Sequence, residues 1–293
     1  MKVLNFGSLN YDYVYHVNHI LKPGETLASD GMETFSGGKG LNQSIALAKA
    51  GVLVYHAGAI GEEGEELVSC LEQNGVCTDY ILKCPGKSGH TVIQVDENAQ
   101  NSILLYGGAN RKITKEYVDD VLSLFGEGDF LILQNEINQL DYIIDKAYEK
   151  RMQIVLNPSP FDSALLACDL KKISYFVMNE IEGEEITKTS DRMNIIMLMK
   201  EKYPKASVLL TLGEKGSIYY DGNSIHEQEI YKVKAVDTTA AGDTFTGYFV
   251  AGLIEGMEPK AMLQRCAKAS GIAVTRKGAA PSIPTALEVL KFE

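Results

Sequence analysis

The sequence lacks tryptophan altogether and contains only five cysteines and eight prolines among its 293 residues. The cysteines form no Cys-x-x-Cys pair and their number is odd, which argues against a zinc site and against a disulfide framework. They are Cys70, Cys77, Cys84, Cys168 and Cys266. We therefore expect reduced thiols with a structural role.

The sequence also has few basic residues relative to acidic ones, and it has no long apolar run. Lysine and arginine number 28 against 39 aspartates and glutamates, which gives a formal net charge of -11. Such a chain is unsuited to broad contact with a nucleic-acid backbone, although a few local basic residues suffice for a small anion. No apolar run approaches the roughly 18 residues that span a bilayer, and the N-terminus is typical of a strand, not of a signal peptide. We expect a cytoplasmic protein that binds neither nucleic acid nor membrane.

The chain has enough apolar residues, 45% of the total, to fill a large core. Strand-like runs alternate with amphipathic helical stretches, which predicts a single three-layer α/β domain over residues 1–293 with a mostly parallel sheet. The predicted strands are 3–8, 54–61, 129–134, 153–159, 175–179 and 207–213. The predicted helices are 41–50, 62–75, 138–150 and 191–203.

Two stretches, residues 11–36 and 80–107, carry strand patterns with turn signals and no helix. Consecutive antiparallel strands of this kind predict a small sheet that projects from the main domain. A projecting sheet serves as a lid over a cleft or as a surface for self-association.

Polar residues follow several predicted strands, where ligands bind in parallel sheets. Each of these signals is weak alone. SGGKGLNQ is not a Walker A motif, and a Gly-rich turn before a helix is often only a cap. Considered together, the amides and carboxylates suit the hydroxyl groups of a sugar or polyol. The set comprises Asn10, Asp12, Lys39, Asn42 and Glu136.

The segment TTAAGD places Asp243 after Ala240, Ala241 and Gly242, at the expected start of a helix. Small side chains and free backbone N–H groups there form an anion hole. A carboxylate beside an anion hole suits phosphoryl transfer, because it accepts the proton of an attacking hydroxyl. The alternative is an acid that merely caps the helix.

Two further segments offer ligand sites with structural alternatives. The turn from Thr211 to Gly216 would let the backbone approach a nucleotide, with Asn179 and Glu180 toward its phosphates and Mg²⁺, or it is an ordinary hairpin turn. The tail VTRKGAAPSIP, which includes Arg276, is a plain loop or forms an oxygen-lined monovalent-cation site with Asp237.

The order of the motifs resembles the PfkB-type carbohydrate kinase family, and within it the ribokinases. The matching motifs are GSLNYD, PGET, GGKGLNQ, GAIGEEG, GGAN, LNPSP, NEIEGEEIT, LTLGEKG, VDTTAAGDTFTG and AVTRKGAAPSIP. The resemblance implies a ribokinase-like α/β domain whose β-sheet lid meets a second copy in a homodimer. It also implies ATP-dependent phosphorylation of a neutral sugar, D-ribose at its 5-hydroxyl, with Mg²⁺ and with K⁺ as an activating ion.

The resemblance assigns roles to residues motif by motif. The sugar would contact Asn10, Asp12, Gly38, Lys39, Asn42, Glu136 and Asp243, and Asp243 would also be the base. ATP would contact Asn179, Thr211, Gly213, Glu214, Lys215, Gly216 and Gly242, with Ala240 and Ala241 beside the anion hole and Glu180 near Mg²⁺. K⁺ would be held by Asp237, Thr239, Ala273, Arg276, Gly278 and Ser282, several of them through backbone carbonyls.

The chain departs from the family pattern at a few positions and leaves its acceptor open. Ala267 stands where relatives often place His or Asn beside adenine, and Leu41 replaces an alanine. The alternatives are a kinase for fructose, another sugar or a nucleoside, and a non-catalytic sugar sensor. A nucleoside would need an aromatic platform, for which the candidates are Tyr11, Tyr13 and Tyr15.

Overall fold

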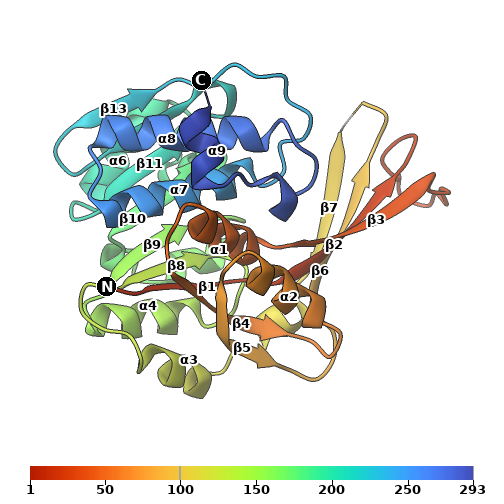
Figure 1. Ribbon diagram of the computed structural model, residues 1–293, viewed down its shortest axis with the longest axis horizontal. Coiled ribbons are helices and arrows are strands. Elements are labelled where there is room, and N and C mark those ends of the chain that lie inside the picture. Colours follow the sequence, from red (N-terminus) through yellow and green to blue (C-terminus); the bar gives the residue numbers. More distant parts are fainter. Residues whose placement is uncertain (99, 293) are drawn as a thin grey trace.

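A nine-stranded sheet forms the centre of the molecule, with the order β13-β12-β11-β10-β9-β8-β1-β4-β5 (Figure 1). This computed structural model describes residues 1–98 and 100–292; Ala99, inside the predicted lid, and Glu293 lie outside the described residues. The strands are β1 (Val3–Phe6), β4 (Val54–Ile60), β5 (Cys77–Lys83), β8 (Phe130–Gln134), β9 (Gln153–Asn157), β10 (Tyr175–Asn179), β11 (Ser207–Thr211), β12 (Ser217–Tyr220) and β13 (Ile225–Gln228). All pairs from β5 to β11 are parallel, and β12 and β13 add antiparallel strands at one edge.

Helices cover both faces of this sheet, as the alternation of strands and helices predicts. Successive residues of β1 point to opposite faces, so Leu4 and Phe6 belong to one apolar core and Val3 to the other. The first core is closed by α3 (Lys115–Leu122), α4 (Leu140–Glu149), α5 (Glu180–Thr187) and α6 (Arg192–Lys202). The second is closed by α1 (Lys39–Lys49), α2 (Glu65–Gln73), α7 (Ala241–Glu255), α8 (Pro259–Ala273) and α9 (Ala286–Lys291). The expected three-layer α/β class is confirmed.

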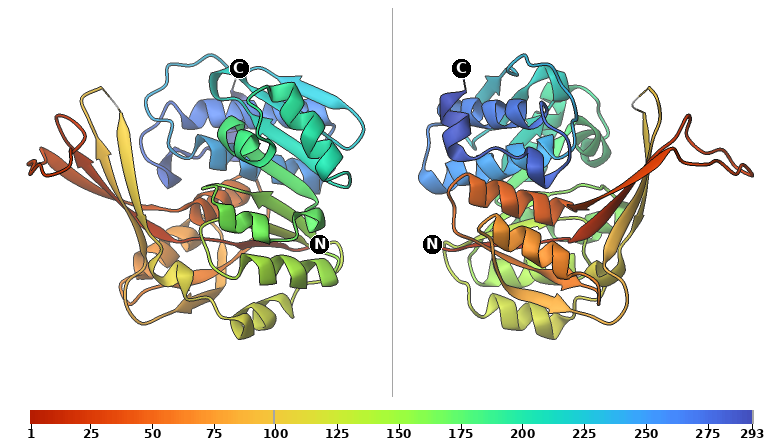
Figure 2. Two further views of the ribbon diagram at one scale, coloured as in Figure 1. Left: turned by 180° about the vertical axis from the view of Figure 1, so that it is seen from behind. Right: turned by 45° about the vertical axis from the view of Figure 1, so that its right-hand side comes forward.

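A separate four-stranded sheet projects from the main body, where the sequence predicts a lid (Figures 1 and 2). Its order is β3-β2-β6-β7, and its strands are β2 (Asn10–His16), β3 (Gly31–Gly37), β6 (Gly89–Val95) and β7 (Asn101–Tyr106). Residues 80–83, expected in the lid, belong to β5 instead and pair with β4 of the main sheet.

The strand directions of this lid also differ from the expectation. The lid consists of two antiparallel hairpins, but its central pair β2–β6 is parallel. The reason lies in the connections: β2 follows β1 and β6 follows β5, and both main-sheet strands run in the same direction. Both hairpins therefore leave the main sheet from its carboxyl edge, where they lie side by side.

A close contact between α1 and α7 joins segments that are far apart in the sequence. At Gly247 of α7, an added Cβ would lie 2.4 Å from Cβ of Ala46 and 2.9 Å from the backbone of α1. Only a residue without a side chain lets the two helices approach so closely. Asp243 lies one turn before Gly247, and Asn42 lies one turn before Ala46. The contact therefore brings Asp243 next to the start of α1.

None of the helices in the described residues is both long and apolar enough to cross a membrane. The five cysteines are free, as expected from their number and spacing.

Gly247→Ala should destabilise the fold by about 1–3 kcal/mol, because the added methyl group forces α7 away from α1. The matched control is Gly271→Ala in α8, where the new Cβ would lie 3.6 Å from its nearest neighbour, an ordinary contact. This control should leave stability unchanged or raise it by about 0.5–1 kcal/mol, since alanine favours the helix. Urea unfolding of both variants measures the difference, and equal midpoints would contradict the proposed close approach.

Candidate active site

The side chain of Asp243 is buried at the first turn of α7 and is held by two amides of α1. Nδ2 of Asn42 donates to Oδ2 of Asp243 over 3.0 Å, and Nε2 of Gln43 donates to Oδ1 over 2.9 Å. Both oxygens of the carboxylate are therefore oriented. A carboxylate has about four acceptor positions, so further positions stay open to a ligand hydroxyl. A residue that only caps a helix makes its hydrogen bonds to the backbone of that same helix, whereas Asp243 is hydrogen-bonded to side chains of another helix.

A second buried carboxylate, that of Glu136 after β8, is bound by the start of α1. Oε2 of Glu136 accepts from the backbone N–H of Lys39 over 3.0 Å and also from the hydroxyl of Ser8. Gly38, which precedes the helix, has φ 93°, and an added Cβ there would lie 3.2 Å from atoms of Ser8 and Asn10. A side chain would strain this turn, so glycine is required for the loop to pack against the strand.

The charges of Lys39 and the nearby acids shift one another's pKa values. Burial alone would lower the pKa of Lys39, but the carboxylates of Asp243, Glu136 and Glu182 outweigh this effect and raise it. Burial raises the pKa of Glu136 in spite of the nearby Lys39. Lys39 is therefore the cation that balances several buried acids.

Asp12 and Asn10, from β2, complete one side of the cluster. Burial raises the pKa of Asp12 to about 6, with smaller contributions from Glu136 and Asp243, although a hydrogen bond from Thr91 opposes the shift. Oδ1 of Asp12 accepts from Thr91 over 2.5 Å, and Oδ1 of Asn10 accepts from Asn110 over 2.7 Å. The predicted sugar-binding side chains thus gather at one point between the lid and α1.

One buried acceptor in this cluster has no partner among the described residues. Oδ1 of Asn42 makes no hydrogen bond, although the residue is only 5% exposed and its Nδ2 is fixed on Asp243. An unpaired buried carbonyl oxygen costs about 1–3 kcal/mol. A ligand hydroxyl that donates to it would recover part of that cost, so the orphan oxygen favours a polyol ligand.

The start of α7 has the conformation of an anion site. Ala240 adopts the left-handed conformation with φ 59°, which is unusual for a residue with a side chain. Ala241 donates its N–H to Thr238 over 3.2 Å, so that group is already occupied. Gly242 is exposed, and nothing lies within 4 Å of where its side chain would be. The open end of the helix is therefore at Gly242 and Asp243 rather than across all four predicted residues.

The predicted nucleotide residues lie at the same edge of the sheet. Asn179 ends β10 and is paired in register with Thr211, which ends β11. The segment after Thr211 is a 3₁₀ turn (Gly213–Lys215) that joins the antiparallel strands β11 and β12. It is therefore a hairpin turn, the structural alternative expected from the sequence. The side chains of Glu214 and Lys215 are exposed, and Gly213 and Gly216 have positive φ.

Asn179 caps α5 through a capping box with Glu182. Both the amide nitrogen and the carbonyl oxygen of its side chain bond to Glu182. Glu182 is 5% exposed and contributes to the raised pKa of Lys39, whereas Glu180 makes a 3.7 Å ion pair with Lys215 and has a half-exposed side chain. Glu182 is thus an acid of the site that the sequence reading missed, although the spacing of a capping box could have indicated it.

The loop before α7 and the loop after α8 are tied together at Asp237. Its carboxylate accepts from the amides of Thr239 and Gly278, each over 2.9 Å. Burial alone would raise the pKa of Asp237. The hydrogen bonds from Thr239 and Gly278 and the charge of Lys277 outweigh burial, so the pKa is lowered. The structure thereby brings together three of the six residues predicted to form an oxygen-lined cation site, namely Asp237, Thr239 and Gly278.

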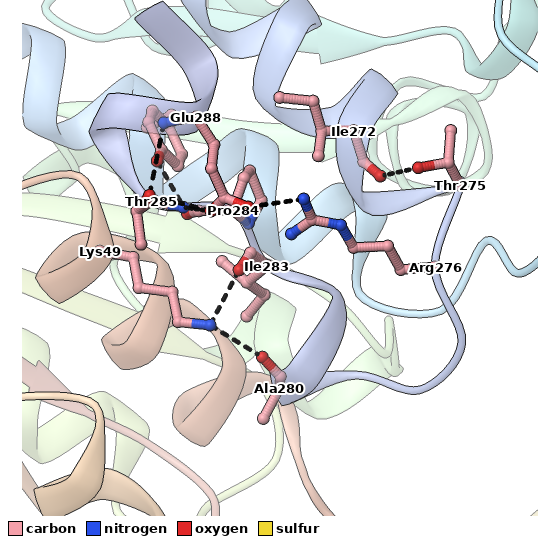
Figure 3. Close-up of polar contacts among 10 residues, drawn as sticks. Lys49, Ile272, Thr275, Arg276, Ala280, Ile283, Pro284, Thr285 and Glu288 are labelled. Atoms are coloured by element: carbon pink, nitrogen blue, oxygen red, sulfur yellow. Dashed lines mark hydrogen bonds and ion pairs between the residues drawn. The ribbon is translucent and has the colours of Figure 1, made fainter. Parts of the chain in front are cut away.

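Two side-chain cations brace this tail (Figure 3). Nζ of Lys49, at the end of α1, donates to the carbonyl of Ile283 over 2.8 Å and to that of Ala280 over 3.3 Å. Arg276 bonds through its side chain to Glu288 over 2.7 Å. The side chain of Arg276 therefore points to α9, which leaves only its backbone for an ion.

The aromatic row of the lid does not share a face with Asp12. Successive residues of a strand point to opposite faces, so Tyr11, Tyr13 and Tyr15 lie opposite Asn10 and Asp12. Tyr11 packs into the core and donates to the carbonyl of Glu63, and its ring stacks on Tyr13. The predicted platform for a nucleoside base is therefore absent from the Asp12 side of this strand.

Comparison with known proteins decides the family. The model of the pfkB family carbohydrate kinases matches residues 1–286. The chain belongs to this family. The kinase is 33% identical to the ribokinase of Haemophilus influenzae, with 98% of this chain and 96% of that protein covered.

The kinase also resembles solved structures over its whole length. The ribokinase of Cryptococcus neoformans in complex with ADP matches with a TM-score of 0.88 and 33% identity, covering 99% of both chains. The ribokinase of Arabidopsis thaliana complexed with ribose and ATP matches with a TM-score of 0.86 and 29% identity, covering 99% and 98% of the respective chains.

Proposed function

We propose that this kinase transfers the γ-phosphoryl group of ATP to the 5-hydroxyl of D-ribose, in the cytoplasm. The observation that carries the proposal is the buried carboxylate of Asp243, oriented by Asn42 and Gln43 at the open end of α7. The ribokinases that it resembles, one of them solved with ribose and ATP, supply the choice of sugar and nucleotide.

In this proposal each group has a role that its position supports. Asp243 takes the proton of the sugar hydroxyl while its oxygen forms a bond to the γ-phosphorus and ADP leaves. The N–H groups at Gly242 and Asp243 stabilise the negative charge on the transferring group. Asn10, Asp12 and the free oxygen of Asn42 hold the other hydroxyls, and Glu136 with Gly38 fixes the loop that carries Lys39.

The nucleotide is expected along Asn179, Thr211 and the turn from Gly213 to Gly216. Among the described residues, no cluster of three or more acidic, histidine or cysteine side chains could hold a metal. This fits Mg²⁺ carried mainly by the ATP phosphates, with Glu182 or Glu180 nearby. Bound there, Mg²⁺ would neutralise phosphate charge.

Asp237, Thr239, Ala273, Arg276, Gly278 and Ser282 are the proposed ligands of K⁺. Carbonyl oxygens and a carboxylate suit such a hard cation. The ion would order the loop that leads into α7, and so act on the anion site without touching the sugar.

The acceptor is tested by measuring ADP release with ribose, deoxyribose, fructose, adenosine and pseudouridine. Ribose should have the highest kcat/KM. Asp243→Asn should lower kcat by about 10²–10⁴-fold, the usual contribution of a general base, while the Kd for ribose measured by calorimetry stays within about threefold. Near-normal turnover would contradict the role of Asp243. A preference for fructose or a nucleoside would reassign the substrate, and absence of ADP release with every sugar would favour a sensor.

Exchanging K⁺ for tetramethylammonium at constant ionic strength should lower kcat/KM by about tenfold, which corresponds to roughly 1.4 kcal/mol of transition-state stabilisation. The physical reason is that the larger cation does not fit a cage of backbone oxygens. Steady-state rates in the two salts provide the measurement. Equal rates would remove the monovalent ion from the proposal.

The lid is the proposed surface for a homodimer. Its strands β3 and β7 expose Met32, Leu104 and Tyr106, each between 51% and 71% exposed, on the face of the sheet that also carries the tyrosine row of β2. Apolar groups gathered on a projecting sheet favour burial against a second copy.

Leu104→Lys should therefore shift the protein from dimer to monomer in sedimentation velocity at micromolar concentration. The matched control is Leu290→Lys on α9, which is 80% exposed but lies far from the lid, and should leave the mass unchanged. A monomeric parent protein would refute this proposal.

A further inference from the structure

A continuous chain of buried polar side chains leads from Asp243 into the core. Gln43, Gln134, Asn5, Ser44 and His56 are each 0% exposed. They come from α1 and from the adjacent strands β8, β1 and β4, where Asn5 is paired in register with His56 (Figure 1). Their neighbours on the same sheet face, such as Val3 and Ile132, are apolar and pack in the core.

The hydrogen bonds of this chain are short and consecutive. Gln134 Nε2 donates to Gln43 Oε1 over 2.7 Å and to Asn5 Oδ1 over 2.9 Å. Asn5 Nδ2 donates to Ser44 Oγ over 2.8 Å, and Ser44 Oγ lies 2.8 Å from Nδ1 of His56. Each group therefore holds the next one in place.

The carboxylate at the end of the chain fixes its direction. An ionised carboxylate only accepts hydrogen bonds, so Gln43 must turn its amide nitrogen to Asp243 and its oxygen to Gln134. Gln134 must then donate, Asn5 must accept from it, and Ser44, which accepts from Asn5, donates to His56. His56 is consequently neutral with its proton on Nε2. Burial lowers its pKa to about 3, which agrees with a neutral ring.

Burying such amides in an apolar face has a free-energy cost, and part of it stays uncompensated because Gln134 Oε1 and His56 Nε2 have no partner among the described residues. Apolar side chains of similar size would fill this face equally well. Asn42 alone would leave the carboxylate free to rotate about its bond to the helix, whereas a second amide that is itself fixed removes this freedom.

We propose that Gln43 is a positioning residue for Asp243, and that Gln134 and Asn5 hold Gln43 in the orientation this requires. The inference rests on the proposed role of Asp243 as base. Gln43 touches no substrate in this proposal. Its contribution is to keep the carboxylate aimed at the sugar hydroxyl, because a misplacement of about 1 Å costs on the order of a hundredfold in rate.

The test uses Gln43→Met, which keeps the volume and removes the amide. We expect kcat to fall about 10- to 100-fold, while KM for ribose and for ATP changes less than about threefold, as for an interaction made in the transition state. The control is Gln153→Met at the opposite, amino end of β9, with kcat unchanged. A kcat within threefold of the parent, or a loss carried by KM, would overturn the proposal.

A cycle with Asp243→Asn separates positioning from general damage to the fold. If Gln43 acts through Asp243, Gln43→Met should lower the residual kcat of Asp243→Asn by less than about twofold. The same fold-loss in both backgrounds would contradict the proposal. High turnover by Asp243→Asn alone would instead refute the base assignment, so the two failures are distinguishable.

Gln134→Met provides a second variant, because its side chain does not touch Asp243. It should lower kcat about three- to tenfold with normal KM, and the double variant Gln43→Met/Gln134→Met should be no slower than Gln43→Met. An unchanged kcat in Gln134→Met would limit positioning to Gln43 and Asn42 and refute the chain. Should Gln43→Met fail to fold, as judged from its thermal unfolding, Gln134→Met alone carries the test.

Discussion

The contact between the first turns of α1 and α7 is the constraint on which the site depends. Within residues 1–98 and 100–292, Asn42 and Gln43 are the side chains that hydrogen-bond the Asp243 carboxylate, and they meet it because Gly247 lets α7 lie against Ala46. The same helix start places the N–H of Lys39 on Glu136. One packing interaction thus determines where Asp243, Lys39 and Glu136 lie relative to one another.

The electrostatics follow from this crowding. Glu136, Asp243 and Glu182 surround Lys39, Asp12 lies near Glu136 and Asp243, and burial raises the pKa of both Asp12 and Glu136. These acids repel another anion but favour hydroxyl groups, which donate hydrogen bonds to the carboxylates without adding charge. A neutral sugar is therefore a better partner for these acids than a sugar phosphate. The proposed place for the phosphates of ATP is the open end of α7, because the first N–H groups of a helix favour anions.

Much of this arrangement could be predicted from the sequence. The alternation of strands and helices indicates the three-layer fold, and the rule that ligands bind at carboxyl ends of parallel strands places Asn10, Asp12 and Glu136 together. The parallel central pair of the lid could not be predicted, because it depends on which main-sheet strands precede the hairpins. Gln43, Gln134 and Asn5 were missed because a buried amide in a strand or helix leaves no local signal. Their role depends on contacts between residues about 40 to 200 positions apart.

The bond between Asn42 and Asp243 joins residues that are 201 positions apart in the chain. A ribosome synthesises α1 early and α7 near the end, and a domain generally folds as a unit. A nascent chain that already contains the lid strands and the loop at Lys39 still lacks Asp243, the proposed base. With Asp243 as the proposed base, phosphoryl transfer therefore requires that α7 has been synthesised and packed against α1.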